Sequence, residues 1–93
     1  MSVTFRIPNY LASFAGGSTE LDLSGTPVNV REALEALWRK YPALRDRIVD
    51  EQGEVRQHIN IFVGPDSIRF AGGLDTPAPD GAEILIVPAV SGG

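Results

Sequence analysis

The last three residues, Ser91-Gly92-Gly93, set one reactive group apart, the terminal carboxylate of Gly93. Two glycines leave no side chain beside that carboxylate, and four residues of extended chain reach about 13 Å. Such a thread can enter a channel too narrow for substituted residues and bring its carboxylate to the active site of another protein. The alternative is a frayed terminus without a task.

The rest of the composition offers little catalytic chemistry. The chain has no cysteine, which excludes a disulfide scaffold, a thiolate zinc site and a cysteine nucleophile, and His58 is its only histidine. We expect His58 to be an ordinary surface or hydrogen-bonded residue. The sequence contains neither a phosphate-binding loop nor a nucleophile elbow, and the acidic residues between 46 and 54 lack the spacing of a calcium loop. We therefore expect neither catalysis nor metal binding by this chain.

Length and charge narrow the class of protein. The 93 residues suffice for one small domain, which buries about two-thirds of the unfolded chain's surface. Eight Lys and Arg against 12 Asp and Glu give a net charge of −4, whereas a nucleic-acid partner requires a basic surface. Every charged side chain beyond Arg69 is acidic. That acidic end is either a solvated surface or a region that attracts a basic partner.

The sequence gives no sign of export or membrane insertion. Its first residues lack the charged start and apolar run of a signal peptide. The longest apolar stretch, residues 84–90, is far shorter than a membrane span. We therefore expect a cytoplasmic protein with no membrane partner.

Two segments near the N-terminus, residues 3–7 and 19–23, alternate apolar and polar side chains, which predicts two strands with one buried face each. Pro8 ends the first strand because it cannot donate to a sheet ladder. Residues 9–18 are predicted to be a loop, with Gly16-Gly17 near its end. The two strands are expected to form an antiparallel hairpin.

The clearest helix follows this hairpin. Asn29 and Glu32 have the spacing of a capping box, in which two side chains satisfy free amides at a helix N-terminus. Apolar residues then recur at helical spacing, which predicts one buried face and an end at Tyr41, before Pro42. These residues are Val30, Ala33, Leu34, Leu37, Trp38 and Tyr41. A further helical turn is expected around residues 44–49, and an acidic turn at 50–54.

Three more strands are expected in the second half. Residues 57–63 alternate, which predicts a strand with its odd-numbered side chains on one face. Phe62 points the other way, where it either closes a second small core or forms an exposed partner contact. A short strand is expected near Ile68 and Phe70. In the segment 83–87 the four residues after Glu83 are apolar without alternation, which is typical of a central strand with a parallel neighbour.

This order of elements predicts an α+β fold, a mixed sheet of four to five strands with one main helix packed on one face. With the first and last strands side by side at the centre, the arrangement is the β-grasp, the fold of ubiquitin. Residues 1–90 are expected to form this single domain. A flexible tail, residues 91–93, is expected to follow.

With these features the chain resembles the ubiquitin-like sulfur carriers of the MoaD/ThiS type, over essentially its whole length. The most specific part is Pro88-Ala89-Val90-Ser91-Gly92-Gly93 after an apolar strand, and residues 69–74 and Asp80-Gly81 add to it. The resemblance implies that an E1-like enzyme uses ATP to adenylate Gly93 and then replaces AMP with sulfur. The product is a C-terminal thiocarboxylate that a second enzyme consumes. The chain itself would be a carrier that binds no cofactor.

The resemblance also assigns roles to the residues before Gly93. Gly92 is the spacer that admits the terminus to the partner's site, and Ser91 and Val90 take part in recognition of the tail. Phe62 and Pro88 are candidates for the partner face.

The sequence of the tail also bears on which biosynthetic pathway receives the sulfur. Small subunits of molybdopterin synthase typically have an aromatic residue and two prolines ahead of the Gly-Gly, but residues 87–90 are Val-Pro-Ala-Val. This ending, Gly16-Gly17 and residues 69–74 look more like carriers that feed cysteine synthesis. There a pyridoxal-phosphate cysteine synthase accepts the sulfur, and a zinc metallopeptidase releases the cysteine.

Several alternatives stay open. The acceptor could be a molybdopterin synthase large subunit or an enzyme of thiamine-type sulfur delivery. The chain could also be a ubiquitin-like modifier conjugated to lysines, because the same tail would serve. A third class is a non-catalytic β-grasp interaction module whose tail has no role.

Overall fold

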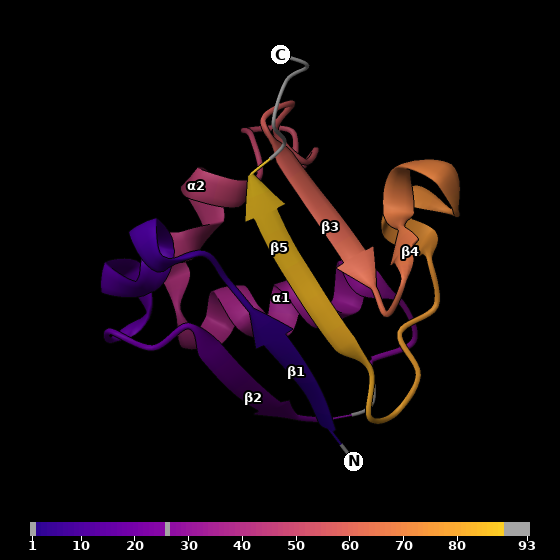
Figure 1. Cartoon of the computed structure of the whole chain (residues 1–93), viewed down its shortest axis with the longest axis horizontal. Helices are drawn as coiled ribbons and strands as arrows, with labels where there is room; N and C mark the ends of the chain where they lie inside the picture. Colours follow the sequence, from indigo (N-terminus) through magenta and orange to yellow (C-terminus); the bar gives the residue numbers. More distant parts are fainter. Residues whose placement is uncertain (1, 26, 89–93) are drawn as a thin grey trace.

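The computed structural model describes residues 2–25 and 27–88, and Figure 1 shows one twisted sheet with the main helix crossing behind it. The strands are β1 (Ser2–Arg6), β2 (Glu20–Ser24), β3 (Ile59–Val63), β4 (Asp66–Ser67) and β5 (Glu83–Pro88). The α-helices are α1 (Val30–Lys40) and α2 (Arg45–Ile48), and four 3-10 helices are η1 (Asn9–Ala15), η2 (Pro42–Leu44), η3 (Ile68–Phe70) and η4 (Gly73–Asp75).

The strand order is β2-β1-β5-β3-β4, with β1 and β5 adjacent and parallel in the middle. The β1–β2, β3–β5 and β3–β4 pairs are antiparallel. The predicted hairpin and the predicted central pairing of the first and last strands are therefore both confirmed. The α+β, β-grasp architecture is confirmed with them.

The two faces of the sheet differ in burial. Phe5, Ile59, Ile84 and Ile86 point toward α1 and are fully buried. Leu85 and Val87 point to the opposite face of β5 and are half-buried. The lack of alternation in β5 thus predicted its central place correctly. Burial nevertheless alternates along the strand, because α1 covers only one face of the sheet.

The helix α1 begins as predicted. The Asn29 side chain accepts a hydrogen bond from the Glu32 N–H at 2.9 Å, and the Glu32 carboxylate accepts one from the Val28 N–H at 3.0 Å. Val30 and Leu37 are fully buried on its inner face, whereas Trp38 and Tyr41 are only partly buried against the core. Neither α1 nor another helix of the described residues is long and apolar enough to cross a membrane.

The predicted loop at residues 9–18 is wrong over most of its length, because Asn9–Ala15 form η1. Leu11 and Ala15 of this helix belong to the core. Gly16 ends it with φ 70°, in the left-handed region, and the Gly17 N–H bonds the Ala12 carbonyl at 2.8 Å. Only two apolar residues of η1 are buried, too few to give a periodic signal in the sequence.

Two further differences concern β3 and the segment after it. β3 begins at Ile59, two residues later than predicted, because Gln57 and His58 form an exposed turn. The strand expected near Ile68 and Phe70 is reduced to Asp66–Ser67. The Ser67 hydroxyl accepts the Arg69 N–H at 3.4 Å and starts a 3-10 turn in place of an extended strand.

Candidate functional site

The face of the sheet opposite α1 is the front of Figure 1, and no helix formed by the described residues lies across it. Strand register places on this open face the alternate residues whose neighbours point into the core. They are Thr4 and Arg6 of β1, Glu20 and Asp22 of β2, Glu83, Leu85 and Val87 of β5, and Asn60 and Phe62 of β3. The open face is polar over β1 and β2 and largely apolar over β3 and β5.

The apolar half of the open face, defined by Phe62, Leu85 and Val87, is continuous across two strands. Phe62 lies directly opposite Leu85, and Asn60 opposite Val87. All three apolar side chains are half-buried. Phe62 lies on this uncovered face, so its assignment as a partner contact stays a prediction that the geometry permits.

Phe70 extends the apolar half beyond the sheet. Its side chain is 91% exposed, the largest exposure among the large hydrophobic residues of the described chain. It lines a shallow groove of about 530 Å³ together with Phe62, Asn60 and Ser67. An aromatic side chain exposed to this extent costs solvation free energy, which favours a contact with another molecule. The sequence predicted Phe70 in a strand and assigned it no role.

The end of β5 lies at one margin of the apolar half. Pro88, its last residue, is exposed and stands opposite Ile59, the first residue of β3. The guanidinium of Arg69 donates to the carbonyls of Gln57 and Ile59 at 2.9 and 2.8 Å. Arg69 therefore fixes η3 to the beginning of β3, beside the exit of β5. The sequence pattern around Arg69 was part of the family resemblance but indicated no such contact.

The predicted tail residues Val90, Ser91, Gly92 and Gly93 lie outside the described residues. The structure thus places the strand that leads to them. β5 pairs with β1 as far as Leu85 and with β3 as far as Pro88, so the ladder with β3 positions the end of the strand.

Ion pairs occupy the polar half of the open face. The Arg6 guanidinium lies 2.9 Å from the Glu83 carboxylate and 3.3 Å from that of Glu20, and the Thr4 hydroxyl donates to Asp22 at 2.8 Å. The hydrogen bond to Glu83, and then the charge of Glu20, raise the pKa of Arg6 above its usual value. A raised pKa means that the pairing stabilises the fold below the ordinary arginine pKa and is lost only as the pH rises through the higher one.

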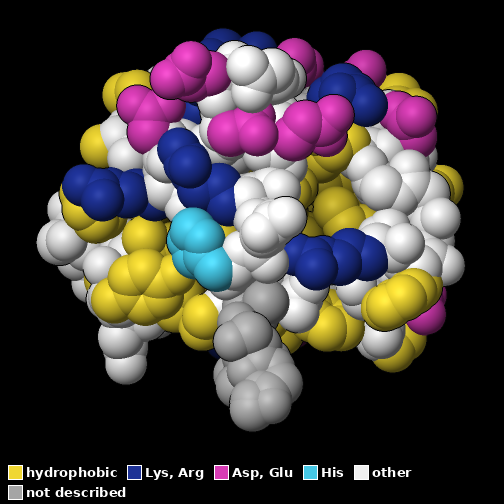
Figure 2. Space-filling model, turned by 90° about the horizontal axis from the view of Figure 1, so that it is seen from above, with side chains coloured by type: hydrophobic (Ala, Val, Ile, Leu, Met, Phe, Trp, Pro, Cys, Tyr) yellow, Lys and Arg dark blue, Asp and Glu magenta, His cyan; other side chains and the backbone are white. Residues whose placement is uncertain are grey.

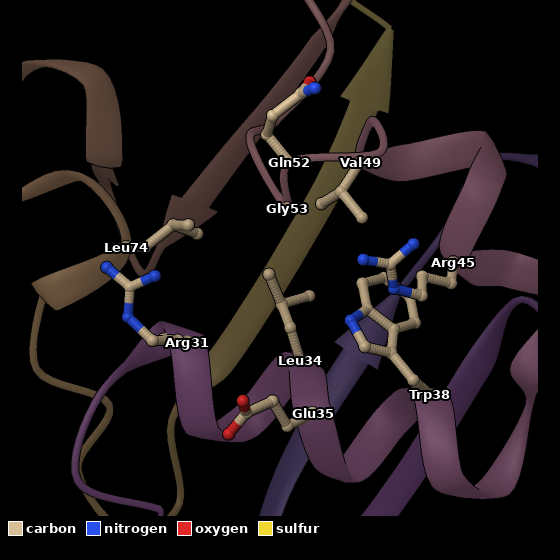
Figure 3. A pocket seen from close by; sticks show the side chains of 9 residues that line it. All are labelled: Arg31, Leu34, Glu35, Trp38, Arg45, Val49, Gln52, Gly53 and Leu74. Carbon is tan, nitrogen blue, oxygen red and sulfur yellow. The ribbon is translucent and has the colours of Figure 1, made fainter.

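The helical side carries a different hollow, a cleft of about 260 Å³ between α1, the loop after α2 and η4 (Figure 3). Leu34, Trp38, Val49 and Leu74 give it an apolar lining, and Glu35, Arg31 and Arg45 also line it. Arg31 is paired with Asp75 at 3.2 Å. Trp38 therefore combines the predicted core packing with a partly open surface.

The end of the molecule at which β5 finishes is shown in Figure 2, where acidic side chains gather along one edge and hydrophobic ones line a hollow. An apolar cleft of about 270 Å³ lies in this part of the fold, lined by Ile59, Ile61, Ile68 and Leu74, with Arg69 beside them.

In the described ranges no three His, Cys, Asp or Glu residues are placed to hold a metal ion. The acidic turn is formed as predicted, with Asp50 accepting the N–H groups of Gln52 and Glu54.

A sequence model of the ThiS family matches residues 5–93. The chain belongs to the ThiS family. The predicted membership of the ubiquitin-like MoaD/ThiS group is thereby confirmed.

Individual relatives agree with this assignment. The sulfur carrier protein CysO of Mycobacterium tuberculosis is 34% identical over 95 aligned residues that cover all of both chains. Small archaeal modifier protein 1 of Haloferax volcanii is 36% identical over 84 residues, 89% of this chain and 91% of that protein. A chain in the Amycolatopsis orientalis BexX/CysO complex superimposes with a TM-score of 0.85 at 32% identity, covering 98% of this chain and 99% of that one.

Proposed function

We propose that this ThiS-family protein is a sulfur carrier whose C-terminal Gly93 is converted to a thiocarboxylate. The observation that carries the proposal is full-length similarity to a protein named as a sulfur carrier, with 34% identity over the whole of both chains. The fold supports it, because the central strand β5 leads straight to the terminal residues and ends beside an uncovered apolar surface.

The chemistry requires activation by a partner. A carboxylate is a poor electrophile, so an E1-like enzyme must first join the Gly93 carboxylate to the α-phosphate of ATP and release pyrophosphate. A sulfur nucleophile then attacks the carbonyl carbon of Gly93, and AMP departs as the leaving group. The carrier supplies the terminus and a recognition surface, and the partner holds the nucleotide.

The apolar half of the open face is the proposed docking surface for this enzyme. Drawing four tail residues into an active site costs about 1–2 kcal/mol of backbone entropy per residue, so binding elsewhere must compensate. Phe62 lies opposite Leu85 of β5, and the exposed Pro88 is the last residue of this strand, which leads to the tail. Gly92 is proposed as the spacer that enters the narrow site, and Ser91 and Val90 as the residues recognised with it.

We further propose that the sulfur serves cysteine synthesis, through a pyridoxal-phosphate cysteine synthase and a zinc metallopeptidase. The support is the Val-Pro-Ala-Val sequence at residues 87–90, which departs from the pattern of molybdopterin synthase small subunits. Relatives named CysO are similar over the whole chain. A molybdopterin synthase large subunit or a thiamine-type acceptor would require only a different second partner, because formation of the thiocarboxylate is the same.

The test is a mass measurement on the intact protein. The full chain is incubated with an E1-like enzyme that activates carriers of the ThiS family, ATP and a sulfide donor. The expected mass gain equals the difference between one sulfur and one oxygen atom. Deleting Gly93, or adding one residue after it, should abolish the gain. An unchanged mass, with a related carrier converted in parallel by the same enzyme, would refute the proposal.

A second candidate, a ubiquitin-like protein modifier, is favoured by the similarity to small archaeal modifier protein 1. In that case the activated Gly93 would form an amide with a lysine of a target protein. Adducts of higher mass that survive thiol reductants in cell extract would support it. Their absence, together with loading of sulfur, would leave the carrier function alone.

A further inference from the structure

The edge strand β2 presents backbone groups that the fold leaves open. The Ile7 N–H bonds the Thr19 carbonyl at 2.9 Å, and the register continues to Leu23 opposite Val3. Hydrogen-bonded and non-bonded pairs alternate in an antiparallel ladder, so the N–H and C=O groups of Glu20, Asp22 and Ser24 point away from β1. The Thr4 N–H donates to the Ala82 carbonyl on the other side of β1, as this alternation requires.

Within the described part of the chain, only Glu20 of these three residues has its outward-facing backbone groups hydrogen-bonded. The Ser18 hydroxyl donates to the Glu20 carbonyl at 2.8 Å and accepts its N–H at 3.3 Å. No described residue hydrogen-bonds the outward-facing N–H and C=O groups of Asp22 and Ser24. A row of unpaired backbone groups at a sheet edge is a template for another extended chain.

A groove runs beside this edge, between β2 and α1. Two adjoining hollows make it up and share Leu23, Ser24, Ala36 and Arg39. Pro27 and Glu32 line one end, whereas Asp22 and Lys40 line the other. Leu23 and Ala36 give the shared middle its apolar lining, and Arg39 and Lys40 of the last turn of α1 lie toward the Asp22 end. Glu32 and Glu35 line the hollow at the other end.

Both cations are available to a ligand. Arg39 and Lys40 are exposed, and no carboxylate of the described chain lies within ion-pair distance of either. The Lys40 ammonium lies 5.7 Å from the centroid of the ring of its neighbour Tyr41. An extended segment paired with β2 would bring every second side chain over the groove, so an acidic side chain at one end would meet both cations.

A second copy of this chain is a poor occupant of the edge. Antiparallel pairing of two β2 strands would place the Glu20 and Asp22 carboxylates of one copy against those of the other, and like charges on facing strands are destabilising. A heterologous segment carries no such penalty. Charge complementarity therefore favours a different protein.

We propose that β2 and α1 form a groove that binds an extended segment of another protein by strand addition. Toward the groove this segment presents two apolar side chains, followed by an acidic one over Arg39 and Lys40. β2 lies at the opposite edge of the sheet from β3 and β4. A partner on β2 therefore leaves the apolar half of the open face accessible, so both surfaces can be occupied together.

The probe is the peptide acetyl-Ile-Thr-Val-Thr-Glu-amide, with the reversed sequence as the parallel-strand alternative. On the ¹⁵N-labelled full chain, the peptide should shift the amide signals of Asp22 and Ser24 and slow their hydrogen exchange. The Leu21 amide, which faces β1 and belongs to a residue outside the groove, serves as an internal reference. Shifts confined to Phe62, Leu85 and Val87, or binding by neither peptide, would overturn the proposal.

Charge-reversal variants serve as matched controls. The double variant R39E/K40E should weaken binding of the peptide about tenfold, because the acidic side chain of the peptide would then face two carboxylates instead of two cations. R47E changes an exposed cation that contacts the Phe14 ring outside the groove and should bind normally. A peptide with Lys in place of Glu should bind wild type weakly and R39E/K40E better. Equal binding in all combinations would contradict the assigned acidic position. Sulfur loading of Gly93 in R39E/K40E reports on the proposed carrier function separately.

Discussion

Phe62 and Phe70 are the residues whose positions are hardest to explain by folding alone. Phe62 stands half-buried opposite Leu85, and Phe70 is almost wholly exposed on a 3-10 turn. Neither belongs to the core. Aromatic side chains at the centre of a surface commonly carry much of the affinity for a protein partner. We therefore expect both residues to contribute more to the proposed docking than to stability.

Replacing Phe62 with Ser is expected to slow loading of sulfur onto Gly93 by about tenfold, because an aromatic anchor contributes 1.4 kcal/mol or more to binding. The rate follows from the intact mass over time at limiting carrier concentration. Asp22→Asn, on the polar half of the same face, is the matched control and should load at the wild-type rate. If both variants load equally fast, the apolar half is not the docking surface.

Asn29 has a purely structural role that can be measured. Its side chain accepts the Glu32 N–H at the start of α1, so Asn29→Ala should lower the free energy of unfolding by about 1 kcal/mol. Denaturant titration followed by circular dichroism gives the value. Glu35→Ala, at an exposed position of the same helix, should change it by less than about 0.5 kcal/mol. If Asn29→Ala lowers the free energy of unfolding no more than Glu35→Ala does, the cap does not stabilise the fold.

At the scale of elements, β5 connects the core to the proposed working end. It pairs with β1 on one side and β3 on the other, and its side chains alternate between the core and the open face. The strand therefore has two tasks that fall on different residues. Ile84 and Ile86 hold it in the sheet, while Leu85 and Val87 are available for a partner.

This division predicts different outcomes for neighbouring substitutions. Ile86→Ala should cost about 2–5 kcal/mol of stability, because it leaves a cavity beneath α1. Leu85→Ala should cost less than about 1.5 kcal/mol, since its side chain is already half in water. Thermal and denaturant unfolding measure the stabilities of the two variants. If Ile86→Ala does not fold, the milder substitution Ile86→Val is measured in its place. Equal losses would show that the open face is covered in solution.

At the scale of the whole molecule, we expect the fold and the tail to be separable. Among the described residues, the core cluster runs from Val3 to Ile86. We therefore expect the body to fold without residues 89–93, so that recognition and chemistry can be lost independently.

Removing residues 89–93 should leave the unfolding midpoint unchanged within error while abolishing the gain of sulfur. Denaturant titration and intact mass are measured on the same preparation. A clearly lower midpoint would show that these residues contribute to the core. Sulfur loading of the shortened chain would show that Gly93 is not the modified residue.

The sequence by itself determined the β-grasp order, the cap and face of α1, the central place of β5 and the Gly-Gly terminus. These are local patterns, because periodicity, caps and prolines act within a few residues. It also placed Phe62 opposite the buried side of β3. It missed η1 and predicted a strand where η3 forms, since short 3-10 segments are held by contacts with distant residues.

Only the tertiary structure decided which surfaces are open. Strand order brings Phe62 opposite Leu85, places Arg69 against the Gln57 and Ile59 carbonyls, and makes β2 an edge beside Arg39 and Lys40. These residues are separated by 10 or more positions in the chain. Their proximity results from sheet pairing, which depends on the packing of the whole core and leaves no mark in any single segment.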